Sequence, residues 1–350
     1  MPASAATQLI DKLRPAKRLL AHYDANARSL PWRSPPGSPP PHPYIVWLSE
    51  VMLQQTTVAT VKPRFRQFIE RWPTIEALAA ASDEQILSEW AGLGYYARAR
   101  NLIACAREVV RRGGFPRTEA ELRALPGLGE YTAAAIAAIA FGERATVIDT
   151  NVARVVARIH GIERPLATAR GEIRSLAGAM TPADRPGDYA QAMMDMGATI
   201  CRPKGPDCMA CPLASDCKAW STGDPERFPA PKPKAARPHR YGIAWWIERN
   251  GAVWLVRRPA KGMLGSMAAL PGPDWTDDPP TSGGDVIISH GFTHFTLDLQ
   301  VAAGIEPQGD GWWQPIDRLH EAGLPTLYVK AVKAMLARKA KLPGKESLAA

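Results

Sequence analysis

Four of the five cysteines lie in one short stretch and could together bind a metal centre. Their spacing is C-x6-C-x2-C-x5-C, formed by Cys201, Cys208, Cys211 and Cys217. The start of the chain has no apolar stretch typical of a signal peptide, so we expect a reducing compartment, where clustered cysteines usually bind metal. Zinc sites commonly pair two C-x2-C knuckles, and a single knuckle in one tight loop favours an iron–sulfur cluster. Zinc and four reduced thiols are the alternatives.

Two carboxylates could carry acid–base chemistry. Glu50 lies in an apolar helical segment with Val46 and Leu53 on the same face. Burial there would raise its pKa and favour a proton donor, and the alternative is an ordinary glutamate on a helix surface. Asp149 immediately precedes another helical segment. From the residues alone, a helix N-cap is the simpler interpretation of Asp149.

The segment LPGLGEYTAAAI at 125–136 predicts a tight turn that leads into a helix. Gly127 turns the chain after a proline, and Gly129 allows a second tight backbone step. The N–H groups of such a turn and helix start can bind a phosphate oxygen. The pattern therefore predicts a helix-hairpin-helix motif, with an ordinary turn between helices as the alternative.

The segments that must position these residues are helical before residue 220 and mixed after residue 240. The pattern of apolar residues predicts helices at 44–60, 83–91, 119–124, 131–141, 150–160 and 170–180. Residues 241–259 predict two strands around Asn250-Gly251, a strong hairpin signal. A further strand is expected within 290–305 and an amphipathic helix at 327–342. The predicted fold is therefore an all-α domain followed by an α+β domain.

Composition and charge indicate two domains and a polyanionic partner. The 350 residues are 46% hydrophobic and 22% charged, which argues against a mainly disordered chain. No uncharged apolar run reaches the roughly 18 residues of a membrane span. The net charge of +9 divides into +6 over 1–220, +3 over the proline-rich segment 221–240 and 0 over 241–350. We expect a basic domain, a basic linker and a neutral domain with these boundaries, and an exposed proline-rich loop at 34–42.

Together, the hairpin, the aspartate that follows it and the cysteine loop resemble the iron–sulfur DNA glycosylases of the endonuclease III superfamily. Within that superfamily the chain resembles the MutY-type adenine DNA glycosylases. The matching segments cover most of residues 30–220 and are LPWR at 30–33, PYIVWLSEVMLQQTTVATV at 43–61, GLGYYARARNL at 92–102, LPGLGEYTAAAI at 125–136, VIDTNVARVVAR at 147–158 and QAMMDMGATIC at 191–201.

The resemblance implies the catalytic roles. Glu50 would protonate adenine, and Asp149 would stabilise or capture the sugar cation. Tyr131 and Asn151 would position the sugar and Asp149, and the four cysteines would hold a [4Fe–4S] cluster. Bifunctional lyases of the superfamily carry a nucleophilic lysine where this chain has Tyr131, so a monofunctional glycosylase is expected. An endonuclease III-like lyase is the alternative, and a non-enzymatic iron–sulfur DNA-binding module is a third possibility.

The resemblance also implies the DNA contacts and the partner. The residues expected to contact the substrate are the pocket wall Leu30, Trp32 and Arg33, the base reader Gln191, the wedge residues Gln55 and Tyr95, and the phosphate-binding Gly127 and Gly129. Residues 241–350 resemble the Nudix-like module that reads 8-oxoguanine, here through Phe292-Thr293-His294. We find no Nudix catalytic box there, so binding rather than hydrolysis is expected. The expected partner is duplex DNA with adenine opposite 8-oxoguanine or guanine, bound by a cytoplasmic monomer.

Overall fold

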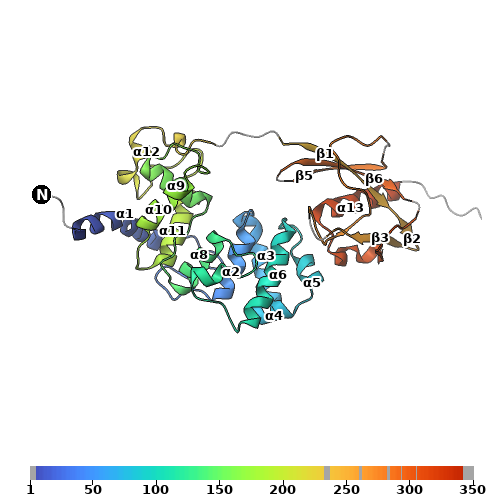
Figure 1. The fold of residues 1–350 in the computed structure, drawn as a ribbon, viewed down its shortest axis with the longest axis horizontal. Helices are drawn as coiled ribbons and strands as arrows, with labels where there is room; N and C mark the ends of the chain where they lie inside the picture. The colour runs from blue at the N-terminus through green and yellow to red at the C-terminus, as the bar shows by residue number, and fades with distance from the viewer. Residues whose placement is uncertain are drawn as a thin grey trace, which may run out of the picture. The chain divides into compact units, whose positions relative to one another are not determined.

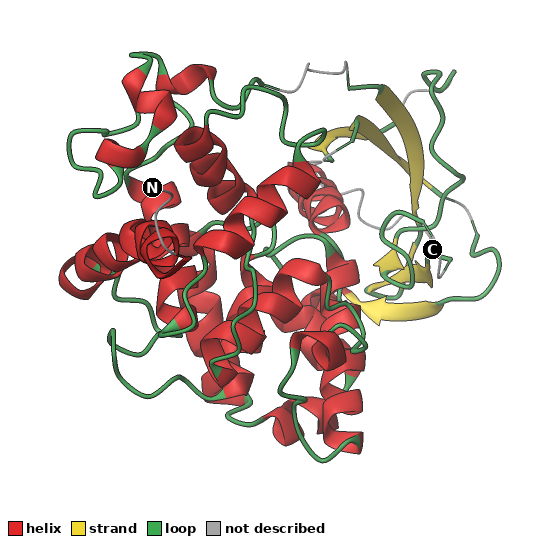
Figure 2. Cartoon of the chain, turned by 60° about the vertical axis from the view of Figure 1, so that its left-hand side comes forward, coloured by secondary structure: helices red, strands yellow, loops and turns green. Residues whose placement is uncertain are grey.

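The chain forms two compact units. The structure is a computed structural model that describes residues 5–231, 237–259, 262–281, 284–292, 294–304 and 306–341. Unit 1 comprises Met1–Ala79 and Ala104–Pro233, and unit 2 comprises Ala80–Ile103 and Lys234–Ala350. Within the described ranges, all strands belong to unit 2 (Figures 1 and 2). Unit 2 also includes residues 80–103, which lie within the segment 1–220 predicted as the N-terminal domain.

The part of the chain before residue 228 is helical. Its α-helices are α1 (Ala5–Asn26), α2 (Pro43–Leu53), α3 (Val58–Arg71), α4 (Ile75–Ala80), α5 (Asp83–Glu89), α6 (Tyr96–Arg111), α7 (Glu119–Leu122), α8 (Glu130–Phe141), α9 (Thr150–His160), α10 (Arg170–Met180), α11 (Pro186–Thr199) and α12 (Lys218–Ser221). Short 3-10 turns occur at Ala214–Asp216 and Pro225–Arg227. None of the described helices is both long and apolar enough to cross a membrane.

Helix α8 carries no charge after its first residue, and this explains its burial. Every residue from 132 to 140 is buried, and the helix packs against α2 and α11. Two glycines of α11 permit close approach to its neighbours. A Cβ on Gly187 would lie 2.6 Å from the Ala138 oxygen, and one on Gly197 would lie 2.6 Å from the Asn151 Cβ. These contacts bring α2, α8, α9 and α11 around one site.

Most predicted helices are confirmed, and one is wrong. Helices α9 and α10 occupy the predicted ranges 150–160 and 170–180, while the ends of α5, α7 and α8 differ from prediction by one or two residues. The single helix expected over 44–60 is two helices, α2 and α3. Gln55 interrupts it with a left-handed backbone of φ 58°. Thr57 then begins a new helix, because its side chain caps α3 by accepting a hydrogen bond from Thr60 N.

The proline-rich segment 34–42 is the exposed loop that the sequence predicts. It contains no helix or strand and leads from Arg33 to the start of α2. Its Gly37 N–H donates a hydrogen bond of 3.1 Å to Asp188 Oδ2 on α11. The loop is therefore attached to the helix that forms one wall of the site.

Unit 2 contains two small sheets and a C-terminal helix. Its strands and the elements after them are β1 (His239–Trp246), β2 (Glu248–Arg249), β3 (Ala252–Arg257), β4 (Ala268–Ala269), β5 (Val286–Gly291), β6 (Thr296–Ala303), β7 (Trp312–Pro315), a 3-10 segment (Ile316–Ala322) and α13 (Thr326–Lys341). One sheet has the order β1-β6-β5, with β1 and β6 parallel. In the other, β3 pairs antiparallel with β2, β4 and β7.

The Asn250-Gly251 turn is confirmed. It joins β2 to β3, and both turn residues have positive φ, 49° and 72°. Alternating inward residues of β3 and β6 form the core with the apolar face of α13, as in Leu255, Leu299 and Ala331. The predicted α+β character of this part of the chain is thus observed.

Candidate active site

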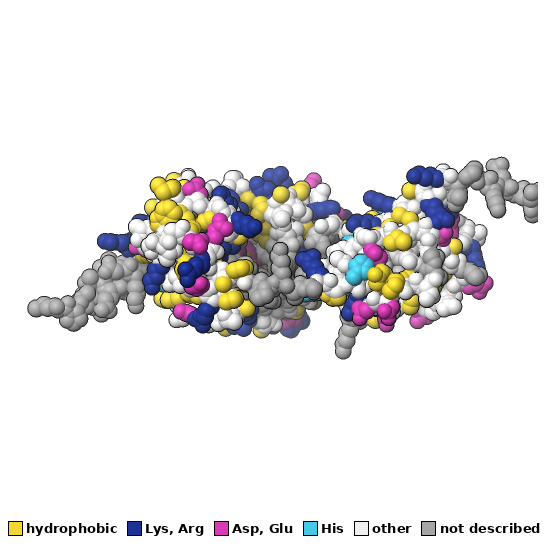
Figure 3. Space-filling view, turned by 90° about the horizontal axis from the view of Figure 1, so that it is seen from above, with side chains coloured by type: hydrophobic (Ala, Val, Ile, Leu, Met, Phe, Trp, Pro, Cys, Tyr) yellow, Lys and Arg dark blue, Asp and Glu magenta, His cyan; other side chains and the backbone are white. Residues whose placement is uncertain are grey.

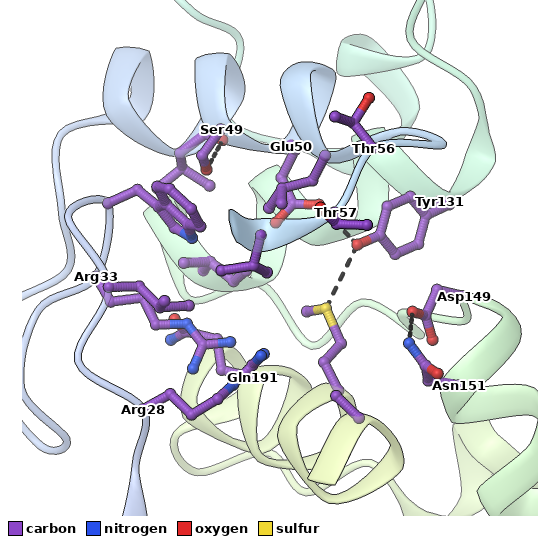
Figure 4. A pocket seen from close by; sticks show the side chains of 18 residues that line it. Arg28, Arg33, Ser49, Glu50, Thr56, Thr57, Tyr131, Asp149, Asn151 and Gln191 are labelled. Atoms are coloured by element: carbon purple, nitrogen blue, oxygen red, sulfur yellow. Dashed lines mark hydrogen bonds between the residues drawn. The ribbon is translucent and has the colours of Figure 1, made fainter. Parts of the chain in front are cut away.

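A cavity of about 260 Å³ in unit 1 collects residues that lie far apart in the sequence. The predicted site residues that line it are Leu30, Trp32, Arg33, Glu50, Tyr131, Asp149, Asn151 and Gln191. The remaining lining residues, which the sequence analysis did not identify, are Arg28, Val46, Ser49, Leu53, Thr56, Thr57, Val58, Ile139, Met194 and Ala198. Figure 4 shows Glu50 entering from α2 while Asp149 and Asn151 enter from the start of α9. The two candidate carboxylates therefore share one cavity.

Glu50 is held as a buried acid. It is 5% exposed, and its Oε2 accepts a 2.7 Å hydrogen bond from the Tyr131 hydroxyl. Burial raises the pKa of Glu50, the Tyr131 hydrogen bond and the Arg33 charge oppose that shift, and the Asp149 charge adds to it. The result is a raised pKa, as a proton donor at neutral pH requires. The alternative of a solvated surface glutamate does not fit this burial.

Tyr131 serves as a neutral hydrogen-bond donor. Burial, followed by the charges of Glu50 and Asp149, raises the pKa of the Tyr131 phenol well above its ordinary value. Its oxygen also lies 3.4 Å from the Met194 sulfur. A tyrosine that keeps its proton can orient the Glu50 carboxyl but offers no amine for a Schiff base.

Asp149 is both a helix cap and a cavity residue. Its Oδ1 accepts a 2.6 Å hydrogen bond from Val152 N, so the predicted N-cap of α9 is confirmed. Its Oδ2 accepts a 3.0 Å hydrogen bond from Asn151 Nδ2. The cap fixes the carboxylate at a helix N-terminus, where the helix dipole stabilises negative charge.

Asn151 links Asp149 to the cysteine loop through Arg154. The Arg154 NH2 group donates to Asn151 Oδ1 at 3.0 Å, and its Nε donates to the Cys201 carbonyl at 2.9 Å. Arg154 is 7% exposed, so these bonds are shielded from water. The amide that orients Asp149 is thus itself oriented by a side chain fixed to the first cysteine.

The four cysteines form a single loop that packs against α9. Cys201 and Cys211 contact the apolar core around α9–α11. Arg158 on α9 is buried and donates to Cys201 Sγ at 3.3 Å and to the Arg202 carbonyl at 2.7 Å. Burial raises the pKa of Cys208, and the Cys201 and Cys217 thiols raise it further, so these sulfurs are close enough to interact.

The four cysteines supply thiolates, a donor set that can hold either an iron–sulfur cluster or a single zinc ion. Among the side chains that the structure describes, no group of three His, Cys, Asp or Glu residues is placed to hold one metal ion. A zinc ion, with Zn–S bonds of about 2.3 Å, would draw the sulfurs to one point. An iron–sulfur cluster binds each thiolate to a separate iron and so holds the sulfurs farther apart.

The predicted hairpin between α7 and α8 is present, with one correction. Gly127 has φ 73°, so the turn requires a glycine there. Gly129 has φ −78°, an ordinary extended backbone, so the second tight step expected there does not depend on a glycine. A Cβ at Gly129 would meet nothing within 4 Å, and no side chain caps α8. The first backbone N–H groups of α8 are therefore not blocked by a neighbouring side chain and could bind a phosphate oxygen.

Comparison with known proteins places the chain in a family. Residues 48–176 match the HhH-GPD superfamily of base excision DNA repair proteins, and residues 243–334 match the NUDIX domain. The adenine DNA glycosylase of Homo sapiens is 45% identical over 218 residues, 60% of this chain and 40% of that protein. The adenine DNA glycosylase of Buchnera aphidicola subsp. Schizaphis graminum is 30% identical over 332 residues, 88% of this chain and 94% of its own length. The chain belongs to the adenine DNA glycosylase family.

The likeness extends to solved structures of glycosylases. A thermostable thymine-DNA glycosylase superposes with a TM-score of 0.54 at 26% identity, over 63% of this chain and 100% of that one. The chain spans about half the length of the first plant and mammalian relatives that it matches. The predicted fold class, a helix-hairpin-helix glycosylase domain with a C-terminal Nudix-like domain, is confirmed for this adenine DNA glycosylase family member.

The predicted wedge residues lie outside the cavity and share an unusual backbone. Gln55 and Tyr95 have φ of 58° and 48°, a left-handed conformation that costs a non-glycine residue about 1–2 kcal/mol. Tyr95 is 46% exposed, and the Arg98 guanidinium lies 5.5 Å from its ring centre. Such strain is common at functional sites of proteins. The wedge role itself stays a prediction.

The predicted lesion-reading loop follows β5 of the Nudix-like part. Phe292 belongs to an aromatic cluster, with ring centres 4.7 Å from Phe295 and 5.5 Å from Trp275. His294 is exposed. Thr293 lies outside the described residues. The contacts of this loop with a lesion stay a prediction.

Sequence reasoning missed a charged group behind the cavity. Asp195 on α11 binds both Arg28 and Arg33, although it does not line the cavity. Asp195 follows the predicted Gln191 by one helical turn, so recognising α11 as a helix would have placed it near the site.

Proposed function

We propose that this chain is a monofunctional base-excision-repair glycosylase that removes adenine paired with 8-oxoguanine or guanine in duplex DNA. The observation that carries the proposal is the cavity in which a buried Glu50 of raised pKa faces Asp149. Adenine would be unstacked and flipped into this cavity, because its glycosidic bond is shielded in the duplex. Release of free adenine in a single turnover tests the proposal.

Glu50 supplies the proton that makes adenine a leaving group. Its carboxyl donates to adenine N7, electrons of the C1′–N9 bond pass to the base, and an oxocarbenium-like sugar remains. Tyr131 holds Glu50 Oε2, so the proton-bearing oxygen is presented to the base. Gln191, Trp32 and Leu30 line the cavity and would read and enclose the purine.

Asp149 stabilises the cation that bond cleavage leaves on the sugar. Its carboxylate is fixed by Val152 N and Asn151 and can act by charge or by transient attachment to C1′. Water then adds its oxygen to C1′ and returns a proton to the now ionised Glu50. The products are free adenine and an abasic site.

The four cysteines would hold a [4Fe–4S] cluster, which when bound would fix the cysteine loop. We expect the purified protein to contain about four irons and four inorganic sulfides per chain. Metal and sulfide analysis checks this, with Cys208→Ser expected to lose iron and Cys105→Ala, at a buried core position, expected to keep it. Stoichiometric zinc would contradict the assignment.

A bifunctional lyase is the alternative, and trapping distinguishes it. Because Tyr131 stands where the lyases carry lysine, we expect borohydride to trap no covalent enzyme–DNA adduct during adenine release. The matched variant Tyr131→Lys introduces the missing amine and is the positive control. An adduct with the unmodified chain, in an amount that matches product, would establish the lyase mechanism instead.

The C-terminal domain is proposed to bind the lesion base through Phe292, Thr293 and His294. The double variant Thr293→Ala/His294→Ala is expected to lose much of the rate preference for 8-oxoguanine over guanine opposite adenine. The measurement is the ratio of single-turnover rates on the two duplexes. An unchanged ratio would remove this loop from lesion reading.

We assign 1–220 as the glycosylase domain, 221–240 as the linker and 241–350 as the lesion reader, acting as a monomer on DNA. The positive surplus lies in the first two of these segments. On the face in Figure 3, Lys and Arg side chains are interspersed with acidic ones rather than gathered in one block. We assign phosphate binding to the Gly127–Gly129 hairpin and the cysteine loop, with affinity that falls as salt rises.

A further inference from the structure

Asp195 is a buried carboxylate between two arginines of the cavity wall. It is 7% exposed and accepts hydrogen bonds from Arg28 Nε at 2.6 Å and from Arg33 NH1 at 2.7 Å. The Arg28 backbone N–H adds a third at 3.3 Å. Both arginines line the cavity that holds Glu50, whereas Asp195 lies behind them.

The net charge of Arg28, Arg33 and Asp195 together depends on whether the Asp195 carboxyl is ionised. Burial raises the pKa of Asp195, but the hydrogen bonds and charges of Arg33 and Arg28 outweigh it and leave the pKa below its ordinary value. The carboxylate is therefore ionised at neutral pH. One of the two positive charges beside the cavity is cancelled as a result.

We propose that Asp195 is a positioning residue that holds Arg28 and Arg33 against the base cavity and cancels part of their charge at Glu50. The proposal rests on the role of Glu50 as the acid of the proposed function. An ion pair with only a structural role would not influence the charge at Glu50. This influence matters because Glu50 must keep its proton beside two guanidinium groups until adenine is bound.

The charged and titratable groups around Glu50 come from several of the elements that form the cavity. The segment before α2 contributes Arg28 and Arg33, α8 contributes the neutral Tyr131, and the start of α9 contributes Asp149. The residues of α11 that line the cavity are uncharged, so the charge of that helix acts from behind, through Asp195. Arg33 already lowers the pKa of Glu50 in part. Loss of the Asp195 charge strengthens that effect and favours ionised Glu50.

The test is the titration of the Glu50 carboxyl in the full-length chain, read by infrared difference spectra against Glu50→Gln. Asp195→Asn keeps the shape and removes the charge, and we expect it to lower the pKa of Glu50 by about 0.5 to 1 unit. Asp188→Asn is the matched control on the same helix, because Asp188 pairs with Arg185 and does not line the cavity. An Asp195→Asn titration equal to that of the control overturns the proposal.

Two further measurements test the same role of Asp195: the titration of Glu50 in Arg33→Gln and the pH dependence of the adenine-release rate. If Asp195→Asn does not fold, Arg33→Gln removes one positive charge and must raise the pKa of Glu50, and an unchanged titration overturns the proposal. In single-turnover assays, the alkaline fall of the adenine-release rate is expected at lower pH in Asp195→Asn. If the unmodified chain released no adenine, only the proposed glycosylase function would be contradicted. The titration of Glu50 would still test the role of Asp195.

Discussion

Glu50→Gln is expected to abolish adenine release while binding to mismatched DNA survives. Glutamine keeps the shape of the buried side chain, and its oxygen can still accept the Tyr131 hydrogen bond seen at 2.7 Å. It cannot give up a proton to N7, and loss of a general acid costs about 10²–10⁴ in rate. The measurements are single-turnover adenine release and a gel-shift titration of the same duplex.

The pH dependence of the adenine-release rate tests the same acid role of Glu50. A proton donor acts in its protonated state, so the rate should fall as the pH rises through the pKa of Glu50. Burial raises that pKa, so activity should extend to higher pH than an ordinary glutamate, with a pKa of about 4.3, would allow. Glu70→Gln on the exposed side of α3 is the matched control and should change neither rate nor profile. An active Glu50→Gln enzyme would remove Glu50 from the acid role.

Asp149→Ser is expected to separate the two functions of Asp149. A serine hydroxyl can still cap α9 by accepting from Val152 N, so the helix should keep most of its stability. The negative charge beside the sugar is lost, and we expect the rate of adenine release to fall by about 10²–10³ or more. Thermal unfolding and single-turnover assays on one preparation check both effects, with Asp149→Asn as a second uncharged variant.

The cap-only interpretation predicts the opposite pattern. If Asp149 only capped α9, both variants would keep their activity, and Asp149→Ala would lose about 1 kcal/mol of stability. Ser82→Ala provides the matched control, because Ser82 caps α5 through a capping box and does not line the cavity. It should lose stability without loss of rate.

Several residues that line the cavity were predictable from local motifs, while others, such as Trp32 and Gln191, followed only from the family resemblance. The hairpin, the N-cap aspartate and the cysteine loop are each written within about twenty consecutive residues, where turn and spacing rules apply. The sequence predicted that the Glu50 carboxyl is buried, because the helical segment around it is apolar on several sides. Local patterns do not reveal contacts between distant segments. The structure shows that the Tyr131 hydroxyl donates a hydrogen bond to Glu50, although 81 positions separate the two residues.

Interactions between distant segments could not be predicted in this way. Arg28 and Asp195 are 167 positions apart, and neither stands out until α11 and the segment before α2 are brought together. The parallel pairing of β1 with β6 likewise depends on packing rather than on a turn. Gln55 shows the reverse case, since helix propensity predicted one helix where the Thr57 cap starts a second.

The most direct test of the central claim is single-turnover release of adenine from duplexes with 8-oxoguanine, guanine or thymine opposite the adenine. Glu50, Tyr131 and Asp149 around one cavity predict free adenine and an intact abasic strand from the duplexes with 8-oxoguanine or guanine, with the thymine duplex as the control. Release of no adenine from any of the three duplexes, by protein that holds its metal centre, would contradict the account.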